Sequence, residues 1–190
     1  AAPVHADLRL ALERLTAVAG RMDAGELPGA VLFACTMNAV RSPMAAAILA
    51  HLVGRRAYVE SAGIRAGEHD PFVDAVMNEI GIDISRHRPR TLEDLNDTSF
   101  DLIVTLSPEA HHQALELTRT MSVDVEYWPT FDASLMIGSG SREQTLQAYR
   151  AVRDQLFARI KRRFRLEGGR RGLGAGSRRL LPLRWSSRRL

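Results

Sequence analysis

The sequence is poor in cysteine and lysine: Cys35 is its only cysteine and Lys161 its only lysine. One cysteine cannot form an internal disulfide, and it cannot build a cysteine-rich metal site, so both kinds of scaffold are excluded. Lys161 lies in a basic run near the end of the chain. A phosphate-binding loop that depends on lysine is therefore excluded as well.

Long apolar runs are also missing, because no stretch approaches the roughly 18 residues that cross a membrane. The first residues, AAPVHADLRL, lack the basic and apolar regions of a signal peptide. We therefore expect a cytoplasmic protein without a membrane span. The 45% hydrophobic and 25% charged residues are typical of a globular protein, and 190 residues favour one domain with an arm or a tail.

Positive charge is concentrated at one end of the chain. Residues 161–190 contain eleven Lys and Arg residues and one acidic residue, a net charge of +10. The whole chain carries +4, so the first 160 residues carry −6 and the basic character belongs to the tail alone. Residues 166–190 mix arginine pairs with Gly and Ser, which predicts a largely disordered tail. Such a tail would bind nucleic acid, acidic lipid or an acidic partner.

The apolar pattern predicts strands that alternate with helices. An amphipathic helix is expected over 7–22, within an N-terminal arm of residues 1–27. Residues 28–165 form the predicted domain, with strands over 30–34, 57–61, 101–106 and 123–128, and helices over 43–53, 70–80 and 108–117. A capping box at 141–144 begins a last helix of about twenty residues. This order predicts a doubly wound, flavodoxin-like α/β fold, a four-stranded parallel sheet with helices on both faces.

Ligands of such folds bind beyond the carboxyl ends of the strands, which directs attention to the loop after the first strand. That loop reads CTMNAVRS over 35–42, with five residues between Cys35 and Arg41. Its backbone N–H groups can form an anion-binding nest at a helix N-terminus, which favours the thiolate form of Cys35. Arg41 can hold two phosphate oxygens, the Ser42 hydroxyl can donate to the thiolate, and Asn38 can brace the loop.

The segment VLFACTMNAVRSPMAAAIL resembles the phosphate-binding loop of the low-molecular-weight protein tyrosine phosphatases, a family with an arsenate reductase branch. Ser61-Ala62-Gly63, the GID and SRHRPR segments after residue 80, and DLIVTLS also resemble family segments. The resemblance covers about residues 29–164, a whole domain. It implies a phosphomonoester hydrolase without metal or cofactor, whose substrate is a phosphorylated protein or a small phosphomonoester.

The resemblance also implies roles for residues of this chain. Cys35 attacks phosphorus and forms a cysteinyl-phosphate that water then hydrolyses. Backbone N–H groups and the Arg41 side chain hold the transferring oxygens. An aspartate in the loop after the fourth strand is the family's general acid, which points to Asp132 here. The expected phosphate-binding residues run from the loop into the next helix: Thr36, Met37, Asn38, Ala39, Val40, Arg41 and Ser42.

Several positions depart from the family pattern. Asp132 is followed by Ala133 where the family usually has Pro, and Met37 stands where the phosphatases usually have Gly. Val40 replaces a second cysteine that some members use to protect the nucleophile. No aromatic residue that could grip phosphotyrosine closely follows the acid. Tyr127, Trp128 and Phe131 all precede it.

Two other functions remain open from the sequence. Arsenate matches phosphate in shape, but a mechanism that passes oxidation through three cysteines of one chain is excluded here, because only Cys35 is present. An arsenate reductase that uses an external small thiol is the remaining form. A non-catalytic phosphate-binding or interaction module is the other alternative. Arg65 and His69 are weaker candidates for the entrance of the site.

Overall fold

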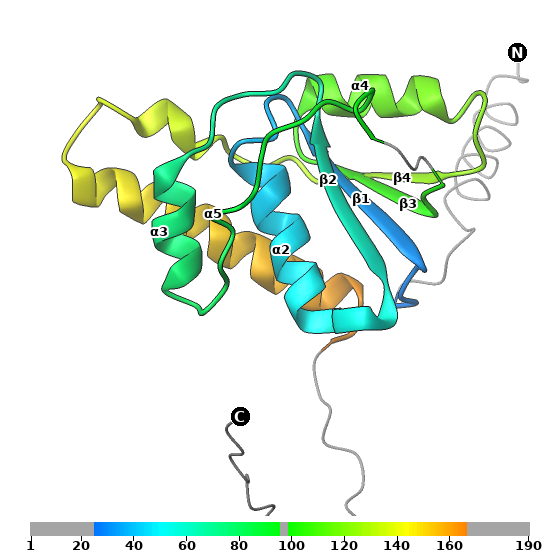
Figure 1. Ribbon diagram of the computed structural model, residues 1–190, viewed down its shortest axis with the longest axis horizontal. Coiled ribbons are helices and arrows are strands. Elements are labelled where there is room, and N and C mark those ends of the chain that lie inside the picture. The colour runs from blue at the N-terminus through cyan, green and yellow to red at the C-terminus, as the bar shows by residue number, and fades with distance from the viewer. Residues whose placement is uncertain (1–24, 96–98, 167–190) are drawn as a thin grey trace, which may run out of the picture.

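A computed structural model describes residues 25–95 and 99–166 (Figure 1). The elements are, in chain order, β1 (Ala30–Cys35), α2 (Arg41–Val53), the 3-10 turn η1 (Gly54–Arg56), β2 (Tyr58–Gly63), α3 (Pro71–Asn78), β3 (Leu102–Thr105), α4 (Pro108–Leu117), β4 (Asp124–Tyr127), the 3-10 turn η2 (Ala133–Met136) and α5 (Arg142–Arg163). The helix expected over 7–22 lies outside the described residues, as does the tail after Leu166. Both stay predictions.

The strands form one parallel sheet in the order β2-β1-β3-β4. β1 is central, and its Ala34 pairs with Ala62 of β2 on one side and with Thr105 of β3 on the other. The predicted doubly wound, four-stranded sheet is confirmed. Since all strands are parallel, their carboxyl ends meet at one edge, where Cys35 ends β1.

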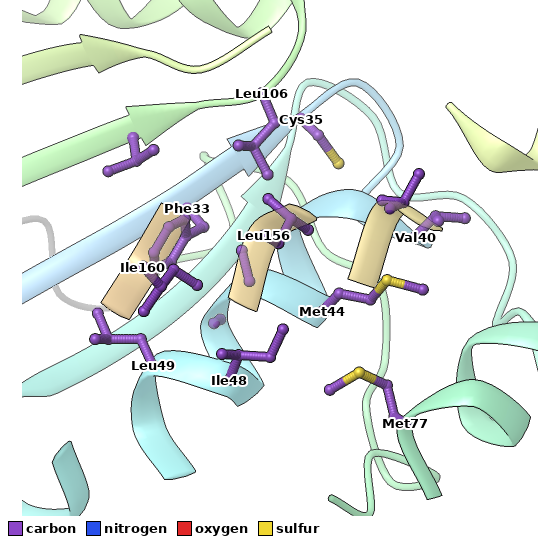
Figure 2. Close-up of a cluster of buried hydrophobic side chains, with 14 of the residues drawn as sticks. Phe33, Cys35, Val40, Met44, Ile48, Leu49, Met77, Leu106, Leu156 and Ile160 are labelled. Carbon is purple, nitrogen blue, oxygen red and sulfur yellow. The ribbon is translucent and has the colours of Figure 1, made fainter. Parts of the chain in front are cut away.

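Helices cover both faces of the sheet, with α2, α3 and α5 on one face and α4 on the other (Figure 1). Alternate side chains of β1 enter different cores, as the two-residue repeat of a strand requires: Phe33 packs toward α2 and α5, whereas Leu32 and Ala34 pack toward α4. Burial on both faces explains the unbroken apolar run of this strand. Figure 2 shows the larger core, to which β1, α2 and α5 contribute Phe33, Cys35, Met44, Ile48, Leu49, Leu156 and Ile160.

Three helices begin at the signals that the sequence contains. The Asp70 carboxylate accepts a hydrogen bond from the Phe72 N–H at 2.8 Å, and Pro71 occupies the first position of α3. Ser107 caps α4 in the same way, accepting from the Ala110 N–H at 3.3 Å. At α5 both hydrogen bonds of the capping box at 141–144 are present.

Some boundaries differ from those expected. α2 begins at Arg41, two residues before the expected start, because the loop turns directly into the helix. α3 ends at Asn78, before a turn that contains Gly81 in the left-handed region at φ 77°. The largest difference is η2, which occupies part of the expected loop 129–140. The Asp132 carboxylate accepts from the Ser134 N–H at 3.1 Å and begins this turn.

A buried contact ties α5 to the start of α3. The Tyr149 hydroxyl donates to the Asp70 carboxylate at 2.6 Å. Burial, together with that carboxylate, raises the pKa of Tyr149, so the phenol stays protonated and acts as the donor. Arg153 adds hydrogen bonds from α5 to the Val76 carbonyl and to Glu79 of the turn after α3. The segment that enters α3 is therefore held in place, and it forms one wall of the site described next.

Candidate active site

The site lies at the carboxyl edge of the sheet, where β1 turns through residues 36–40 into α2. Cys35 is buried at the bottom of a cavity of about 410 Å³. The lining comes from three segments, residues 35–41, 67–72 and 132–137. Figure 2 shows the Cys35 side chain at the end of β1, at the border of the core. The strand and the helix thus place one nucleophilic atom at the base of an open cavity.

Ser42 adjoins the thiol of Cys35. Its Oγ lies 2.9 Å from the Cys35 Sγ and 3.3 Å from the Ala62 carbonyl, to which it can also donate. A serine has one hydroxyl proton, so it serves either the carbonyl or the sulfur. With a thiol, Cys35 donates and Ser42 bonds to Ala62. With a thiolate, the hydroxyl proton turns to the sulfur, and this stabilises the charged form.

Asn38 fixes the shape of the loop from inside. It is fully buried and adopts a left-handed φ of 50°, a conformation that asparagine tolerates better than most residues. Its Nδ2 donates to Ser42 Oγ and to Ser61 Oγ, both at 2.9 Å. Its Oδ1 accepts from the Arg90 N–H at 3.0 Å. One side chain therefore connects the loop to β2 and to the segment before Thr91.

His87 supports the same loop residue through its backbone. The His87 Nε2–H donates to the Asn38 carbonyl at 2.8 Å, because a carbonyl can only accept. Burial lowers the pKa of His87, and the charges of the nearby His69 and Arg88 lower it further. The hydrogen bond to the Asn38 carbonyl and the charge of Asp74 act in the opposite direction and are outweighed. The neutral imidazole is therefore the form favoured by the fold.

Arg41 faces the acid that the sequence suggested. Its guanidinium donates to the Asp132 Oδ2 at 2.9 Å and to the Thr130 carbonyl at 3.3 Å, with a weaker contact to Thr36 Oγ1 at 3.5 Å. The other oxygen of Asp132 accepts from the backbone and the hydroxyl of Ser134, at 3.1 and 2.7 Å. The acid is therefore oriented from two sides, and Arg41 already points into the cavity that Cys35 lines.

Met37 is accommodated by a glycine on the opposite segment. The Gly67 N–H donates to the Met37 carbonyl at 2.8 Å, and a Cβ added at Gly67 would lie 3.1 Å from the Met37 Cβ. Gly63 has a similar function, since a Cβ there would lie 2.8 Å from the Asn38 backbone nitrogen. The Cβ at position 37 thus fits because Gly67 has none, and the backbone of the loop can approach β2 because Gly63 has none.

The structure places the predicted residues as follows. Cys35, Arg41 and Asp132 share one cavity, although Asp132 is far from the others in sequence. His69 also lines it, with its Nε2 at 2.6 Å from the Asp74 carboxylate, whereas Arg65 is not among the lining residues. Of the three aromatic residues before the acid, Trp128 is buried in the core, Tyr127 stacks on His111, and Phe131 is exposed.

Sequence reasoning missed the residues that reach the loop from elsewhere in the fold. Ser61 and His87 bond to Asn38, and the Glu109 carboxylate accepts from Thr36 Oγ1 at 3.2 Å. The backbone N–H of Glu109 itself, at the start of α4, is the largest cause that lowers its pKa, followed by Thr36. The sequence could have indicated Glu109, because it begins the helix that follows β3, and the carboxyl end of β3 lies beside that of β1. No spacing in the sequence indicates the other two contacts.

The described residues contain neither a candidate metal cluster nor a candidate membrane-spanning helix. Residues 25–95 and 99–166 contain no group of three or more His, Cys, Asp or Glu side chains placed to hold a metal ion. Within the same ranges, no helix has the length and apolar character that crossing a membrane requires. The expected cytoplasmic location stays a prediction.

Comparison with known families agrees with this geometry. The model of the low molecular weight phosphotyrosine protein phosphatase family matches residues 30–163. The chain belongs to this family. The match runs from the first residue of β1 to the last residue of α5, so it covers the entire sheet and every element that contributes to the cavity. The family resemblance of the sequence is confirmed.

Arsenate reductases and phosphatases are both among the similar proteins. An arsenate reductase of Shouchella clausii is 34% identical over 133 residues, which is 70% of this chain and 92% of the relative. An arsenate reductase of Bacillus subtilis is 31% identical, covering 69% of this chain and 91% of the relative. Among solved structures, an arsenate reductase in an oxidized state is 26% identical, with a TM-score of 0.58 over 72% of this chain and 97% of that one. The tyrosine phosphatase amsI of Erwinia amylovora shares the fold at 20% identity, with a TM-score of 0.57 over 74% and 94% of the two chains.

Proposed function

We propose that this family member is a phosphomonoester hydrolase that dephosphorylates tyrosine residues of proteins through a cysteinyl-phosphate. One observation carries the proposal: Cys35, Arg41 and Asp132, a nucleophile, a cation and an acid, line one cavity. Ser42 can supply a hydrogen bond to the thiolate. The proposed phosphate-binding residues run from Thr36 to Ser42, with the backbone N–H groups of the loop as further donors.

In the first step, the Cys35 thiolate attacks phosphorus opposite the leaving oxygen. The new S–P bond forms as the P–O bond breaks, and the leaving oxygen takes a proton from Asp132. As the substrate binds, Arg41 exchanges its hydrogen bond with Asp132 for bonds to phosphoryl oxygens, and the released Asp132 carboxylate takes up from solvent the proton that it then donates. The same event thus neutralises the transferring group and frees the acid to reach the leaving oxygen.

In the second step, water hydrolyses the cysteinyl-phosphate. Asp132, now a carboxylate, takes one proton from the water as its oxygen attacks phosphorus. The S–P bond breaks and its electron pair returns to sulfur, where Ser42 donates its hydroxyl proton as a hydrogen bond. Inorganic phosphate leaves and Asp132 again carries the proton that the next leaving group requires; when that proton is released instead, the ion pair with Arg41 forms again.

An aromatic leaving group suits the shape of the cavity. Above Cys35 the walls include the apolar side chains of Met37, Val40, Phe72 and Ile137. The ring of phosphotyrosine can pack between such walls. The side chain of phosphoserine is too short to span the cavity when its phosphate is held at the buried thiol. This supports phosphotyrosine as the substrate.

Hydrolysis of an activated aryl phosphate, with EDTA present, tests the proposal. We expect turnover by the wild type and only background hydrolysis by Cys35→Ser. Peptides that differ only in phosphotyrosine or phosphoserine then test the specificity, and we expect hydrolysis of the first alone. An active Cys35→Ser variant would contradict the mechanism. A wild type that binds phosphate without hydrolysing any ester would exclude the phosphatase and leave arsenate reduction or a non-catalytic binding module.

Arsenate reduction is the second candidate, favoured by the names of the relatives that are 34% and 31% identical. The chain has no cysteine besides Cys35, so a small external thiol must complete the reaction. The thiolate of Cys35 would displace hydroxide from arsenate and form an S–As bond. The external thiol would attack this sulfur, and arsenite would leave with the electron pair of the S–As bond. The mixed disulfide left on Cys35 needs a second thiol for its reduction.

Formation of arsenite in the presence of arsenate and a small thiol tests this candidate. Arsenite production that requires both Cys35 and the thiol, without hydrolysis of aryl phosphates, would replace the phosphatase proposal by this one. Production of no arsenite by an enzyme that hydrolyses aryl phosphates would exclude it.

A further inference from the structure

Large apolar side chains are exposed around the mouth of the catalytic cavity. Within the part of the chain that the structure describes, seven large hydrophobic side chains are exposed. Two of them line this cavity, and two more directly adjoin in the chain residues that line it. They are Met37 at 38%, Phe131 at 53%, Leu135 at 71% and Ile137 at 52% exposure. We call these four residues the apolar collar. Exposed apolar groups concentrated at one place are typical of a binding surface.

The collar continues the wall of the site. Met37 and Ile137 line the cavity that contains Cys35. Phe131 directly precedes Asp132, and Leu135 lies in η2, the turn that Asp132 caps. A substrate held at Cys35 with its leaving oxygen at Asp132 therefore brings its neighbouring groups toward these side chains.

Two collar residues, Leu135 in η2 and Ile137 directly after it, belong to a segment that is held in place. η2 packs against α5. The Met136 carbonyl accepts a hydrogen bond from Thr145 Oγ1 at 3.3 Å, and the Ser139 hydroxyl donates to the same carbonyl at 2.8 Å. Leu135 and Ile137 on either side of Met136 are thus presented to solvent by a packed turn. A surface that is already ordered loses little conformational entropy when it binds a partner.

Charge is scarce on the segment that carries three of the four collar residues. Between Pro129 and Gly140 the only charged residue is Asp132, and its carboxylate is paired with Arg41. The facing wall of the cavity contains two carboxylates, Glu68 and Asp70, and these would repel an acidic group beside the phosphorylated residue. An apolar side chain would instead remove both its own surface and that of the collar from water.

We propose that the apolar collar binds a large apolar side chain next to the phosphorylated residue of a polypeptide substrate. The proposal rests on the function proposed above and specifies the sequence context in which that substrate is recognised. An inorganic oxyanion or a small aryl phosphate held at Cys35 is too small to reach Phe131 and Leu135, the collar residues that do not line the cavity. A polypeptide carries a second side chain at the required distance.

The test compares two phosphotyrosyl peptides that differ only at the neighbours of phosphotyrosine, with leucine in one and aspartate in the other. We expect the wild type to prefer the leucine peptide by about tenfold in kcat/KM, or about 1.4 kcal/mol. Leu135→Ser and Ile137→Ser should each reduce this ratio. Leu115→Ser is the matched control, because Leu115 is also exposed, at 46%, but lies near the far end of α4. It should keep the ratio.

Each other outcome has a definite meaning. Equal kcat/KM for the two peptides in the wild type, or a preference that survives both collar substitutions, would overturn the collar proposal while the phosphatase stands. A dimer in light scattering that Leu135→Ser converts to a monomer would assign the collar to a second copy of the chain and overturn the proposal. Failure of the wild type on every phosphoester would overturn the proposed function itself.

Discussion

The Arg41 guanidinium and the Asp132 carboxylate form an ion pair at 2.9 Å in the cavity that Cys35 lines. Both side chains are largely shielded from water, at 9% and 25% exposure. The pair links the start of α2 to the loop after β4. The residue proposed to bind the phosphoryl group therefore also holds the residue proposed to protonate the leaving oxygen.

Arg41→Lys should lower kcat/KM for an aryl phosphate by about 100-fold or more, the usual cost of losing an oxyanion donor. Lysine keeps the charge, but it cannot bond two phosphoryl oxygens in the fixed geometry of a guanidinium. Steady-state kinetics measures the effect, with thermal unfolding as the control for folding. A folded variant with nearly wild-type kcat/KM would contradict the assigned role.

Asp132→Asn should affect substrates according to their leaving groups. For poor leaving groups we expect kcat/KM to fall by about 10²–10⁴-fold, because general acid catalysis is lost. A strongly activated aryl phosphate needs no proton and should lose much less. Glu109→Gln is the matched control, since it removes another carboxylate that contacts the loop, through Thr36. Glu109→Gln should keep the wild-type dependence of kcat/KM on the leaving group. If Asp132→Asn instead lowered kcat/KM equally for all substrates, the role of Asp132 as general acid would be contradicted.

The sequence was sufficient to predict the sheet and the central residues of the site, but not the contacts that hold those residues in place. The buried strand before Cys35 and the capped helices follow from local patterns, and local patterns are what single sequences contain. Asp132 was reached through the family resemblance. Its pairing with Arg41, like the bond from His87 to Asn38, joins segments that only the folded chain brings together.

The turn η2 is a second feature that the sequence could not predict. Its sequence, ASLM, carries no strong helical pattern, and it forms because the Asp132 carboxylate binds the Ser134 N–H and because the turn packs on α5. Tertiary packing decides the conformation of such short segments. Its exposed leucine is therefore visible as a surface feature only in the structure.

Asn38 should contribute to stability in two separable ways. Asn38→Ala places a Cβ residue at φ 50° without the side-chain hydrogen bonds, whereas Asn38→Gly relieves the backbone but also loses those bonds. We expect both variants to be less stable than the wild type, with alanine lower than glycine by about 1 kcal/mol. Urea unfolding measures the difference. A glycine variant as stable as the wild type would show that the hydrogen bonds of the buried amide contribute no more than glycine gains by relieving the backbone.

His87 should make stability depend on pH. The fold lowers its pKa below the ordinary value of 6.5, so in this range the unfolded chain binds more protons than the native protein. The free energy of unfolding should therefore decrease as the pH falls below about 6.5 toward the native pKa of His87. In His87→Gln, part of this decrease should disappear. Urea unfolding at a series of pH values measures it, and an unchanged pH dependence would contradict the assignment.

The most direct test of the mechanism is to trap the covalent intermediate. Asp132→Asn is mixed with a strongly activated aryl phosphate, so that formation of the intermediate is fast and its hydrolysis, which needs the carboxylate, is slow. The reaction is quenched, and the protein is digested and sequenced by mass spectrometry. The account predicts a phosphoryl group on Cys35, absent from the double variant Cys35→Ser/Asp132→Asn. Turnover of the ester with no phosphorylated Cys35 at any time point, or with the phosphoryl group on another residue, would contradict it.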